Sequence, residues 1–235
     1  PKVRKSEVQP MKCEKKHDLG AIYDVVSKYY TEKINTFGPS ANGVDWKDAS
    51  SQVLRFAKLL ELTAGDSDFS ICDWGCGYGA LLDYMHLRHD TVDYRYVGYD
   101  WSEKMIAEAT RLHGPEILKG EPQWHCGTEY FTSVDYTVAS GIFNVKLGQS
   151  TENWQEYVLN TLRKINALSR RGFAFNMLTS YSDVEKMRSD LNYASPTFYF
   201  DLCKSEFSRY VTLLHDYPLY EFTILVWKKA RPGDE

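Results

Sequence analysis

The segment Phe69–Leu82 places three glycines at alternate positions directly after a short apolar run. Gly75, Gly77 and Gly79 follow Asp73, and a helix-compatible run begins right after the last of them. A strand that ends in such a turn and enters a helix brings backbone N–H groups close to a polar ligand, because glycine has no Cβ to obstruct the approach. The segment therefore predicts a strand–turn–helix unit that binds a nucleotide-like cofactor.

The rest of the chain alternates between helix and strand patterns. Two amphipathic helices are predicted before the first strand, one ending near Phe37 and one running from Asp48 or Ser50 to Leu62. Later helices are predicted at 80–87, after Ser102 as an N-terminal cap and after Thr151 as another. Strands are predicted at Tyr94–Tyr99, Gln123–Cys126, Tyr136–Ala139 and Phe173–Leu178. The runs Tyr210–Leu214 and Tyr220–Trp227 predict a closing hairpin. We expect an α/β fold with a Rossmann-like doubly wound sheet of about seven strands, mostly parallel with an antiparallel C-terminal hairpin, and helices on both faces.

The length of 235 residues fits one α/β domain. Residues 11–62 are expected to form part of a lid and residues 63–235 the Rossmann-like core, with residues 1–10 left out of the fold prediction. The aromatic, proline-containing stretch 180–204 is predicted to be an insertion that covers a pocket, and a surface excursion packed by its own aromatic side chains is the alternative. Three aromatic residues of the N-terminal part are expected at the pocket mouth, with core packing as the alternative: Tyr29, Tyr30 and Trp46.

Composition excludes several other classes of protein. The five cysteines are odd in number and form no CxxC pair, which favours reduced thiols in a cytoplasmic protein over a disulfide framework or a metal site. No apolar run approaches the roughly 18–20 residues of a membrane span, and no apolar signal region is present at the N-terminus. The net charge of −4 argues against a nucleic-acid partner. One cluster of positive charge keeps that alternative open, although a solvated helix face is expected there: Arg163, Lys164, Arg170 and Arg171.

Between about residues 69 and 227 the chain resembles the class I S-adenosylmethionine-dependent methyltransferases. The resemblance rests on the Asp73-x-Gly75-x-Gly77-x-Gly79 loop, on Asp100 after the second strand and on the closing hairpin. The same glycines also fit the dinucleotide pattern of dehydrogenases, so a nicotinamide-dependent oxidoreductase is one alternative. A non-catalytic S-adenosylmethionine-binding module is another. The acidic residue two positions before the first glycine and the hairpin favour the methyltransferase.

The resemblance implies S-adenosylmethionine as the cofactor, and its contacts are predicted at Arg55, Asp73, Gly75, Cys76, Gly77, Asp100, Trp101, Gly127, Thr128 and Ser140. Asp100 would accept the ribose hydroxyls, Trp101 would pack on the adenine, and Arg55 would bind the carboxylate as a planar fork. The alternatives are a helix-entry carboxylate for Asp100, plain packing for Trp101 and a surface salt bridge for Arg55. Thr128 departs from the Gly-Asp that the family often carries there.

The acceptor is expected to be a small molecule methylated on O or N, without a metal ion and without nucleic acid. Alignment of the nucleophile with the methyl group supplies much of the acceleration in such a transfer, and an oxygen nucleophile often also needs a base. His215 and Asp216 on the hairpin turn are the predicted acid/base pair, with a structural role as the alternative. Asn144, Asn176 and Tyr181 are predicted to contact the substrate, because they lie at or near strand ends.

Overall fold

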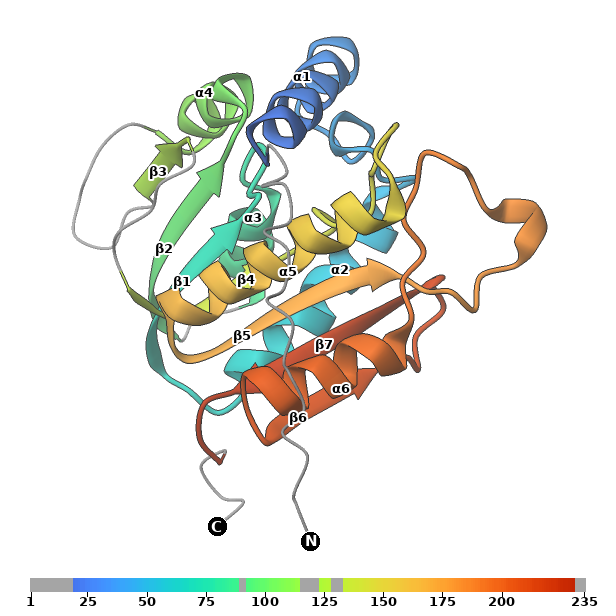
Figure 1. Ribbon diagram of the computed structural model, residues 1–235. Coiled ribbons are helices and arrows are strands. Elements are labelled where there is room, and N and C mark those ends of the chain that lie inside the picture. Colours follow the sequence, from blue (N-terminus) through green and yellow to red (C-terminus); the bar gives the residue numbers. More distant parts are fainter. Residues whose placement is uncertain (1–18, 89–91, 115–122, 128–132, 231–235) are drawn as a thin grey trace, which may run out of the picture.

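The computed structural model describes residues 19–88, 92–114, 123–127 and 133–230, and in this part the chain forms one seven-stranded sheet (Figure 1). The strand order is β3-β2-β1-β4-β5-β7-β6. β1 to β5 run parallel to one another, and β7 is antiparallel to both β5 and β6. The bounds are β1 Asp68–Trp74, β2 Asp93–Asp100, β3 Gln123–Cys126, β4 Val134–Ala139, β5 Ser169–Leu178, β6 Tyr210–Leu214 and β7 Glu221–Trp227. The predicted mixed sheet is confirmed.

Helices cover both faces of this sheet, as predicted (Figure 1). Their bounds are α1 Leu19–Phe37, α2 Ala49–Leu60, α3 Ala80–Arg88, α4 Glu103–His113, α5 Thr151–Leu168 and α6 Pro196–Glu206. Three short 3-10 helices lie at η1 Asn42–Val44, η2 Glu61–Thr63 and η3 Val184–Lys186. None of the helices in the described part of the chain combines the length and apolarity that crossing a membrane requires.

Alternation along β1 divides the core into two layers. Phe69 and Ile71 pack with α2 and α3, whereas Cys72 and Trp74 pack with α1, α5 and α6. Successive strand side chains point to opposite faces, so a parallel strand covered on both faces reads as a continuous apolar run. The apolar lead-in to the glycine loop is therefore explained by burial on both sides of the sheet.

Several element boundaries differ from the predicted ones, and contacts in the structure explain two of the differences. Ser150, not Thr151, caps α5, because its hydroxyl accepts the N–H of Asn153 and Thr151 is already the first helical residue. β5 begins at Ser169, earlier than predicted, because that residue pairs with Val134 of β4.

The stretch 180–204 contains η3 and most of α6, and α6 packs on β6 and β7. None of its residues lines the cavity described below. The contacts of this stretch therefore do not support the prediction that it covers a pocket. Its helix α6 instead packs on the sheet with the other helices.

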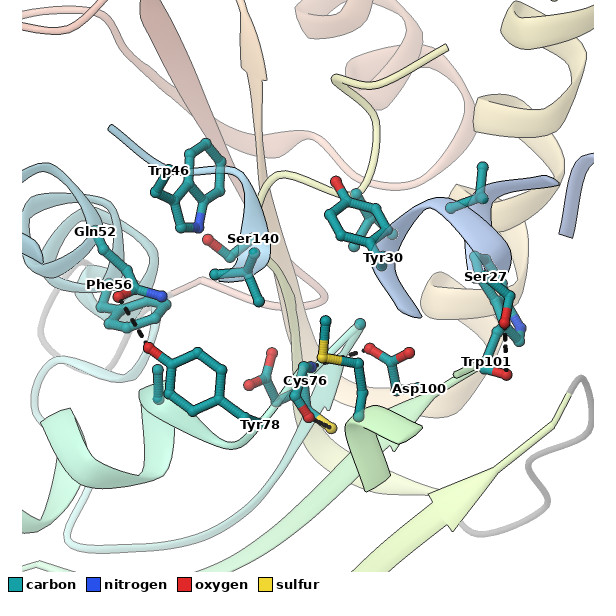
Figure 2. A pocket seen from close by; sticks show the side chains of 18 residues that line it. Ser27, Tyr30, Trp46, Gln52, Phe56, Cys76, Tyr78, Asp100, Trp101 and Ser140 are labelled. Carbon is teal, nitrogen blue, oxygen red and sulfur yellow. Dashed lines mark hydrogen bonds between the residues drawn. The ribbon is translucent and has the colours of Figure 1, made fainter. Parts of the chain in front are cut away.

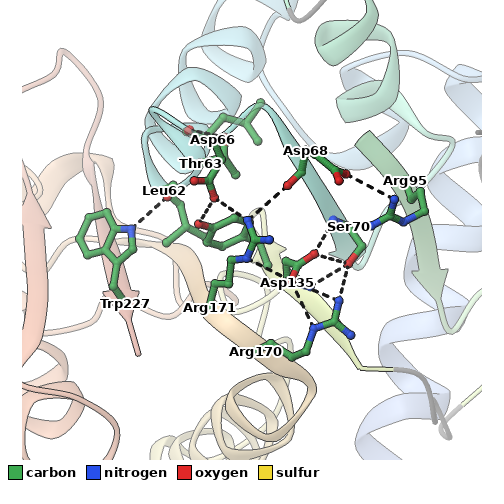
Figure 3. Close-up of polar contacts among 12 residues, drawn as sticks. Leu62, Thr63, Asp66, Asp68, Ser70, Arg95, Asp135, Arg170, Arg171 and Trp227 are labelled. Carbon is green, nitrogen blue, oxygen red and sulfur yellow. Dashed lines mark hydrogen bonds and ion pairs between the residues drawn. The ribbon is translucent and has the colours of Figure 1, made fainter. Parts of the chain in front are cut away.

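Charged side chains form a network at the amino ends of the strands (Figure 3). Asp135 of β4 accepts the backbone N–H and the hydroxyl of Ser70, both at 2.9 Å, and contacts Arg170 at 3.2 Å. Arg171 pairs with Asp66 at 3.0 Å. Arg163 of α5 is not part of this network and pairs with Glu206 of α6 at 3.0 Å. The cluster of positive charge noted in the sequence is thus largely matched by carboxylates, and its two β5 arginines hold strand ends together.

At the opposite edge, α1 lies across the carboxyl ends of the central strands (Figure 1). The hydroxyl of Thr31 is 2.8 Å from that of Ser102, at the start of α4. Tyr29 and Lys33 both donate to Asp45, at 2.8 and 2.6 Å, and so tie α1 to the segment that leads into α2. α1 and this connecting segment together form a roof over the carboxyl edge of the sheet.

Candidate active site

A cavity opens beneath this roof, at the carboxyl ends of β1, β2 and β4 (Figure 2). It holds about 760 Å³ of empty space, including its open mouth. Ligands of α/β sheets bind beyond the carboxyl ends of the strands, at the point where the strand order reverses. β1 and β4 flank that point here, so the position of the cavity fits a binding site.

The glycine loop shapes the floor of the cavity. Gly75 and Gly77 have φ values of 85° and 55°, in the left-handed region that favours glycine. A Cβ on Gly75 would lie 2.2 Å from Cγ2 of Ile142, so any other residue would have to displace the Ile142 side chain and adopt a strained backbone. The backbone N–H groups of Gly75 and Cys76 both donate to the carbonyl of Tyr99, at 2.7 and 3.0 Å. The turn is thus fixed against β2 before any ligand binds.

Asp100 connects this loop to the start of α4. Its two carboxylate oxygens accept the backbone N–H of Gly77 at 3.0 Å and that of Ser102 at 2.8 Å. Burial raises the pKa of the carboxyl above its usual value, although both hydrogen bonds act in the opposite direction. Each oxygen retains a lone pair that can accept a ligand hydroxyl. Asp100 thus contacts the helix entry and also lines the cavity, so a role at the helix entry and a role in ligand binding are compatible.

Asp73 is the second carboxylate in the cavity. It is 3% exposed and accepts the hydroxyl of Tyr96 at 2.7 Å. Burial raises its pKa to about 7; the Tyr96 hydrogen bond opposes this and the charge of Asp100 adds to it. A carboxyl with this pKa gains and loses its proton near neutral pH, and a cation bound beside it would favour the ionised form.

The cavity has a clear electrostatic character. Asp73 and Asp100 are the charged residues that line it, and no lysine, arginine or histidine is among its lining residues in the described part of the chain. Such a lining attracts a cation and repels a pyrophosphate. S-adenosylmethionine carries a sulfonium, an ammonium and a carboxylate group, so its net charge is positive and the residues present fit it. A nicotinamide dinucleotide is negatively charged at its pyrophosphate, which would find no cationic partner among the described lining residues. The hydroxyl of Ser140 adds a buried polar group with no partner in the described structure.

Five of the side chains that line the cavity are aromatic. Tyr30 comes from α1, Trp46 from the segment before α2, Phe56 from α2, Tyr78 from the glycine loop, and Trp101 follows β2. Of the three aromatic residues expected at the mouth, Tyr30 and Trp46 line the cavity. The third, Tyr29, instead packs on Tyr30 and binds Asp45.

Several predicted cofactor residues come together in this cavity: Asp73, Gly75, Cys76, Gly77, Asp100, Trp101 and Ser140. Gly127 lies beside them, where its N–H donates to the carbonyl of Asp100 at 3.3 Å, but it does not line the cavity. Thr128 lies outside the described residues. The Trp101 indole N–H is bonded to the hydroxyl of Tyr99 at 3.0 Å, which fixes the ring at the cavity wall.

Arg55 and Asn176 lie behind the wall. Arg55 is 7% exposed and forms an ion pair with Glu221 at 2.5 Å, so the structure gives it a partner other than the expected cofactor carboxylate. Asn176 is fully buried; its amide donates to Glu221 at 2.8 Å and accepts the N–H of Gly141 at 2.7 Å. Neither residue lines the cavity.

The remaining predicted catalytic and substrate residues are also placed away from the cavity. His215 and Asp216 are exposed on the hairpin turn, where Asp216 is 3.5 Å from Lys58. This turn lies at the carboxyl edge, but the sheet order places β5 and β7 between it and β4. Tyr181 is 68% exposed and packs near His215. Asn144 is buried and accepts the N–H of Leu178 at 2.9 Å.

Sequence reasoning missed part of the lining. Val26, Ser27, Val44, Met105 and Ile142 contribute to the walls. Their positions depend on how α1, the connecting segment, α4 and the loop after β4 meet, and no local spacing reports that. In the described part of the chain, no group of three or more histidine, cysteine, aspartate or glutamate residues could hold a metal ion.

No family model matches the chain, but one curated relative does. It is the Mycobacterium tuberculosis (strain ATCC 25618 / H37Rv) protein Rv1506c, provisionally named a methyltransferase. The two are 52% identical over 163 residues, which is 69% of this chain and 95% of the relative. Identity at this level over nearly the whole relative shows common family membership.

Solved structures share the fold at much lower identity. The magnesium protoporphyrin IX methyltransferase of Synechocystis PCC 6803, with bound S-adenosylhomocysteine, superposes with a TM-score of 0.59 at 14% identity, over 90% of this chain and 100% of that one. Phosphoethanolamine N-methyltransferase 1 of Haemonchus contortus gives 0.61 at 14% identity, over 92% and 51%. A Haloferax volcanii methyltransferase in complex with the Trm112 activator gives 0.55 at 11% identity, over 90% and 99%.

Proposed function

Because the chain belongs to the class I S-adenosylmethionine-dependent methyltransferases, we propose that its cavity binds this cofactor and that the enzyme methylates O or N of a small-molecule acceptor. The observation that carries the proposal is the cavity lining. Two carboxylates, Asp73 and Asp100, meet there without a lysine, arginine or histidine among the described lining residues.

Three parts of the chain would hold the cofactor. Asp100 would accept the ribose hydroxyls with the lone pairs left by its two backbone bonds. The glycine loop would admit the amino-acid tail, because Gly75 and Gly77 leave the floor without side chains. Asp73 would stabilise the positive charge of the bound molecule. Trp101 would pack on the adenine, since its ring is already fixed at the same end of the cavity as Asp100 (Figure 2).

When bound, S-adenosylmethionine supplies an activated methyl group, so the protein mainly has to exclude water and align the acceptor. The roof of α1 and the aromatic walls restrict access of water to the cavity. Two structural neighbours are named after small molecules, magnesium protoporphyrin IX and phosphoethanolamine, which supports a small acceptor here; the neighbour bound to Trm112 is named without an acceptor. His215 and Asp216 stay a proposed acid/base pair only if acceptor binding brings the hairpin turn to the cavity.

Calorimetry with S-adenosylhomocysteine and with NAD tests the cofactor assignment. We expect S-adenosylhomocysteine to bind and NAD not to bind. Asp100→Asn should weaken S-adenosylhomocysteine by about 1–3 kcal/mol, the scale of a lost charged hydrogen bond. Tight binding of NAD without binding of S-adenosylhomocysteine would establish the oxidoreductase instead. Methyl incorporation from labelled cofactor across a small-molecule panel then separates an enzyme from a non-catalytic binding module.

A further inference from the structure

One end of the cavity is distinct from the end that contains Asp100 and Trp101. Figure 2 shows Trp46, Gln52 and Ser140 on one side of Cys76, and Asp100 and Trp101 on the other. We call the former the Trp46 compartment; its walls are Trp46, Gln52, Phe56, Tyr78 and Ser140. These five residues supply aromatic rings, an amide and two hydroxyls, and none of the five is charged, although the Asp73 carboxylate lines the same cavity.

Trp46 is held tightly in this compartment. A Cβ on Gly141 would lie 2.2 Å from Cζ2 of the indole, so the ring rests directly on the backbone after β4. The guanidinium carbon of Arg55 lies 3.9 Å from the ring centroid. Stacking of this kind fixes a ring orientation, because the planar guanidinium favours the aromatic face. Ser140, next to Gly141, lines the same compartment.

A buried network holds Arg55 in turn. Its guanidinium contacts both oxygens of Glu221 at 2.5 to 2.9 Å, and Glu221 is 1% exposed. Asn176 donates to the same carboxylate and accepts the N–H of Gly141. The contacts thus close a ring that runs from Trp46 through Arg55, Glu221, Asn176 and Gly141 back to Trp46. Four separate segments, namely the connection before α2, α2, the β5–β7 pair and the loop after β4, meet in it.

A contribution to stability does not by itself explain this buried network. Burying an ion pair costs desolvation that the mutual attraction repays only with complete hydrogen bonding. Nη1 of Arg55 is buried without a partner in the described structure, so the bonding is incomplete. A role in positioning explains why charges are present where apolar residues would pack at lower cost.

We propose that the Trp46 compartment binds the methyl acceptor as an uncharged molecule with an aromatic or apolar face, and that Arg55, Glu221 and Asn176 position Trp46 as its specificity-determining wall. The proposal rests on the methyltransferase function proposed above. An anionic acceptor is disfavoured because none of the five residues that form the compartment is a cation. A flat face is favoured because three of the five are aromatic: Trp46, Phe56 and Tyr78.

Two probes that share a naphthalene ring and differ in the charge of their substituent test the ligand class. Binding of 2-naphthol and of 2-naphthoate is measured by calorimetry on protein saturated with S-adenosylhomocysteine. We expect 2-naphthol to bind, and 2-naphthoate to bind at least about tenfold more weakly. This factor is a minimum for burying a carboxylate without a partner. Equal binding of the two, or no binding of 2-naphthol, would overturn the proposal. Failure of S-adenosylhomocysteine to bind would instead reject the proposed function.

The wall itself is tested with Trp46→Ala. This variant should lose about tenfold or more in affinity for 2-naphthol, as expected for removal of a central aromatic contact, while the affinity for S-adenosylhomocysteine stays within about twofold. Unchanged affinity for 2-naphthol would show that Trp46 is not the wall. An equal loss for both ligands would assign Trp46 to the general structure of the cavity and not to acceptor specificity.

The positioning role needs a variant that folds. Arg55→Met combined with Glu221→Leu replaces the ion pair by apolar side chains, which buried pairs tolerate well. We expect the variant to fold with reduced urea stability, because the buried Asn176 amide loses its acceptor. Its affinity for S-adenosylhomocysteine should be unchanged and its binding of 2-naphthol about tenfold weaker. The matched control is Arg163→Met with Glu206→Gln, which removes an exposed pair between α5 and α6 and should change neither affinity. Wild-type affinity for 2-naphthol in the first double variant would reject the positioning role.

Discussion

At the scale of single residues, Asp73 determines how the cavity responds to pH. Burial raises its pKa from 3.8 to about 7. The folded chain therefore keeps, between about pH 4 and pH 7, a proton that the unfolded chain has released. The stability that this group contributes is complete below about pH 4 and is lost as the pH rises through 7.

Asp73→Asn should flatten this pH dependence. The amide is neutral at every pH and its oxygen can still accept the Tyr96 hydroxyl. We expect the variant to be more stable than the wild type at pH 8, by on the order of 4 kcal/mol, and similar to it at pH 4. Urea unfolding at both pH values checks this. A wild-type advantage at pH 8 would show that the Asp73 carboxylate is stabilised, not penalised, in the free protein.

Cofactor binding should release protons near pH 6.5. An ammonium group beside Asp73 favours its ionised form, so the pKa of Asp73 falls when the ammonium end of S-adenosylhomocysteine binds next to it. Calorimetric titrations in two buffers with different ionisation enthalpies measure the number of protons released. We expect release in the wild type and little or none in Asp73→Asn. Equal release from both proteins would place the titrating group elsewhere.

At the scale of elements, the chain signals its helices and strands well and their ends less well. Thr151 and Ser150 are adjacent hydroxyl residues that both qualify as a cap, and only the contact with Asn153 decides between them. The sequence predicts an irregular insertion where α6 lies, because a proline within a stretch argues against regular structure. In the structure Pro196 stands in the first turn after the Ser195 cap, where proline is favoured.

The cap assignment for α5 can be measured directly. Ser150→Ala removes the acceptor for the N–H of Asn153 and should cost about 1 kcal/mol of unfolding free energy. Thr151→Ala should change stability by less than about half of that amount, because its side chain is exposed and caps nothing. Chemical denaturation of both variants gives the comparison. The reverse order of effects would restore the cap predicted from the sequence.

The candidate site is predictable only where one motif contains it. Asp73, the glycines and Asp100 follow from a strand, a turn and the end of the next strand, so local spacing places them together. Contacts between distant segments, such as Trp46 on Gly141, have no local signature. The prediction for His215 shows the same limitation. Its turn lies at the carboxyl edge of the sheet, as the cavity does, but the strand order separates it from β1 and β4, and local spacing does not report that order.

At the scale of the whole molecule, α1 is a separate layer that closes the cavity. It is held by the burial of Ile22 and Val26 and by polar contacts to Ser102 and Asp45. Val26, Ser27 and Tyr30 of the same helix line the cavity. A ligand that fills the space beneath α1 therefore adds contacts to the helix and stabilises its docked position.

Hydrogen exchange with and without S-adenosylhomocysteine tests this closure. We expect backbone amides of α1 to exchange more slowly when the ligand is present, since local opening must then break additional contacts. Amides of β5 and β7 should change little, because both strands lie beyond β4 in the sheet order and neither lines the cavity. Protection limited to the glycine loop, with α1 unchanged, would show that the helix does not close on the ligand.

The ion pair between Arg55 and Glu221 joins residues 166 positions apart in the chain. During synthesis Arg55 leaves the ribosome long before Glu221, so α2 cannot bury its guanidinium favourably until β7 has been made. The Trp46 compartment is therefore completed late in folding, by the last strand in chain order among the described residues. A growing chain could form the glycine loop and β2 well before the Trp46 compartment, where the acceptor is proposed to bind, is complete.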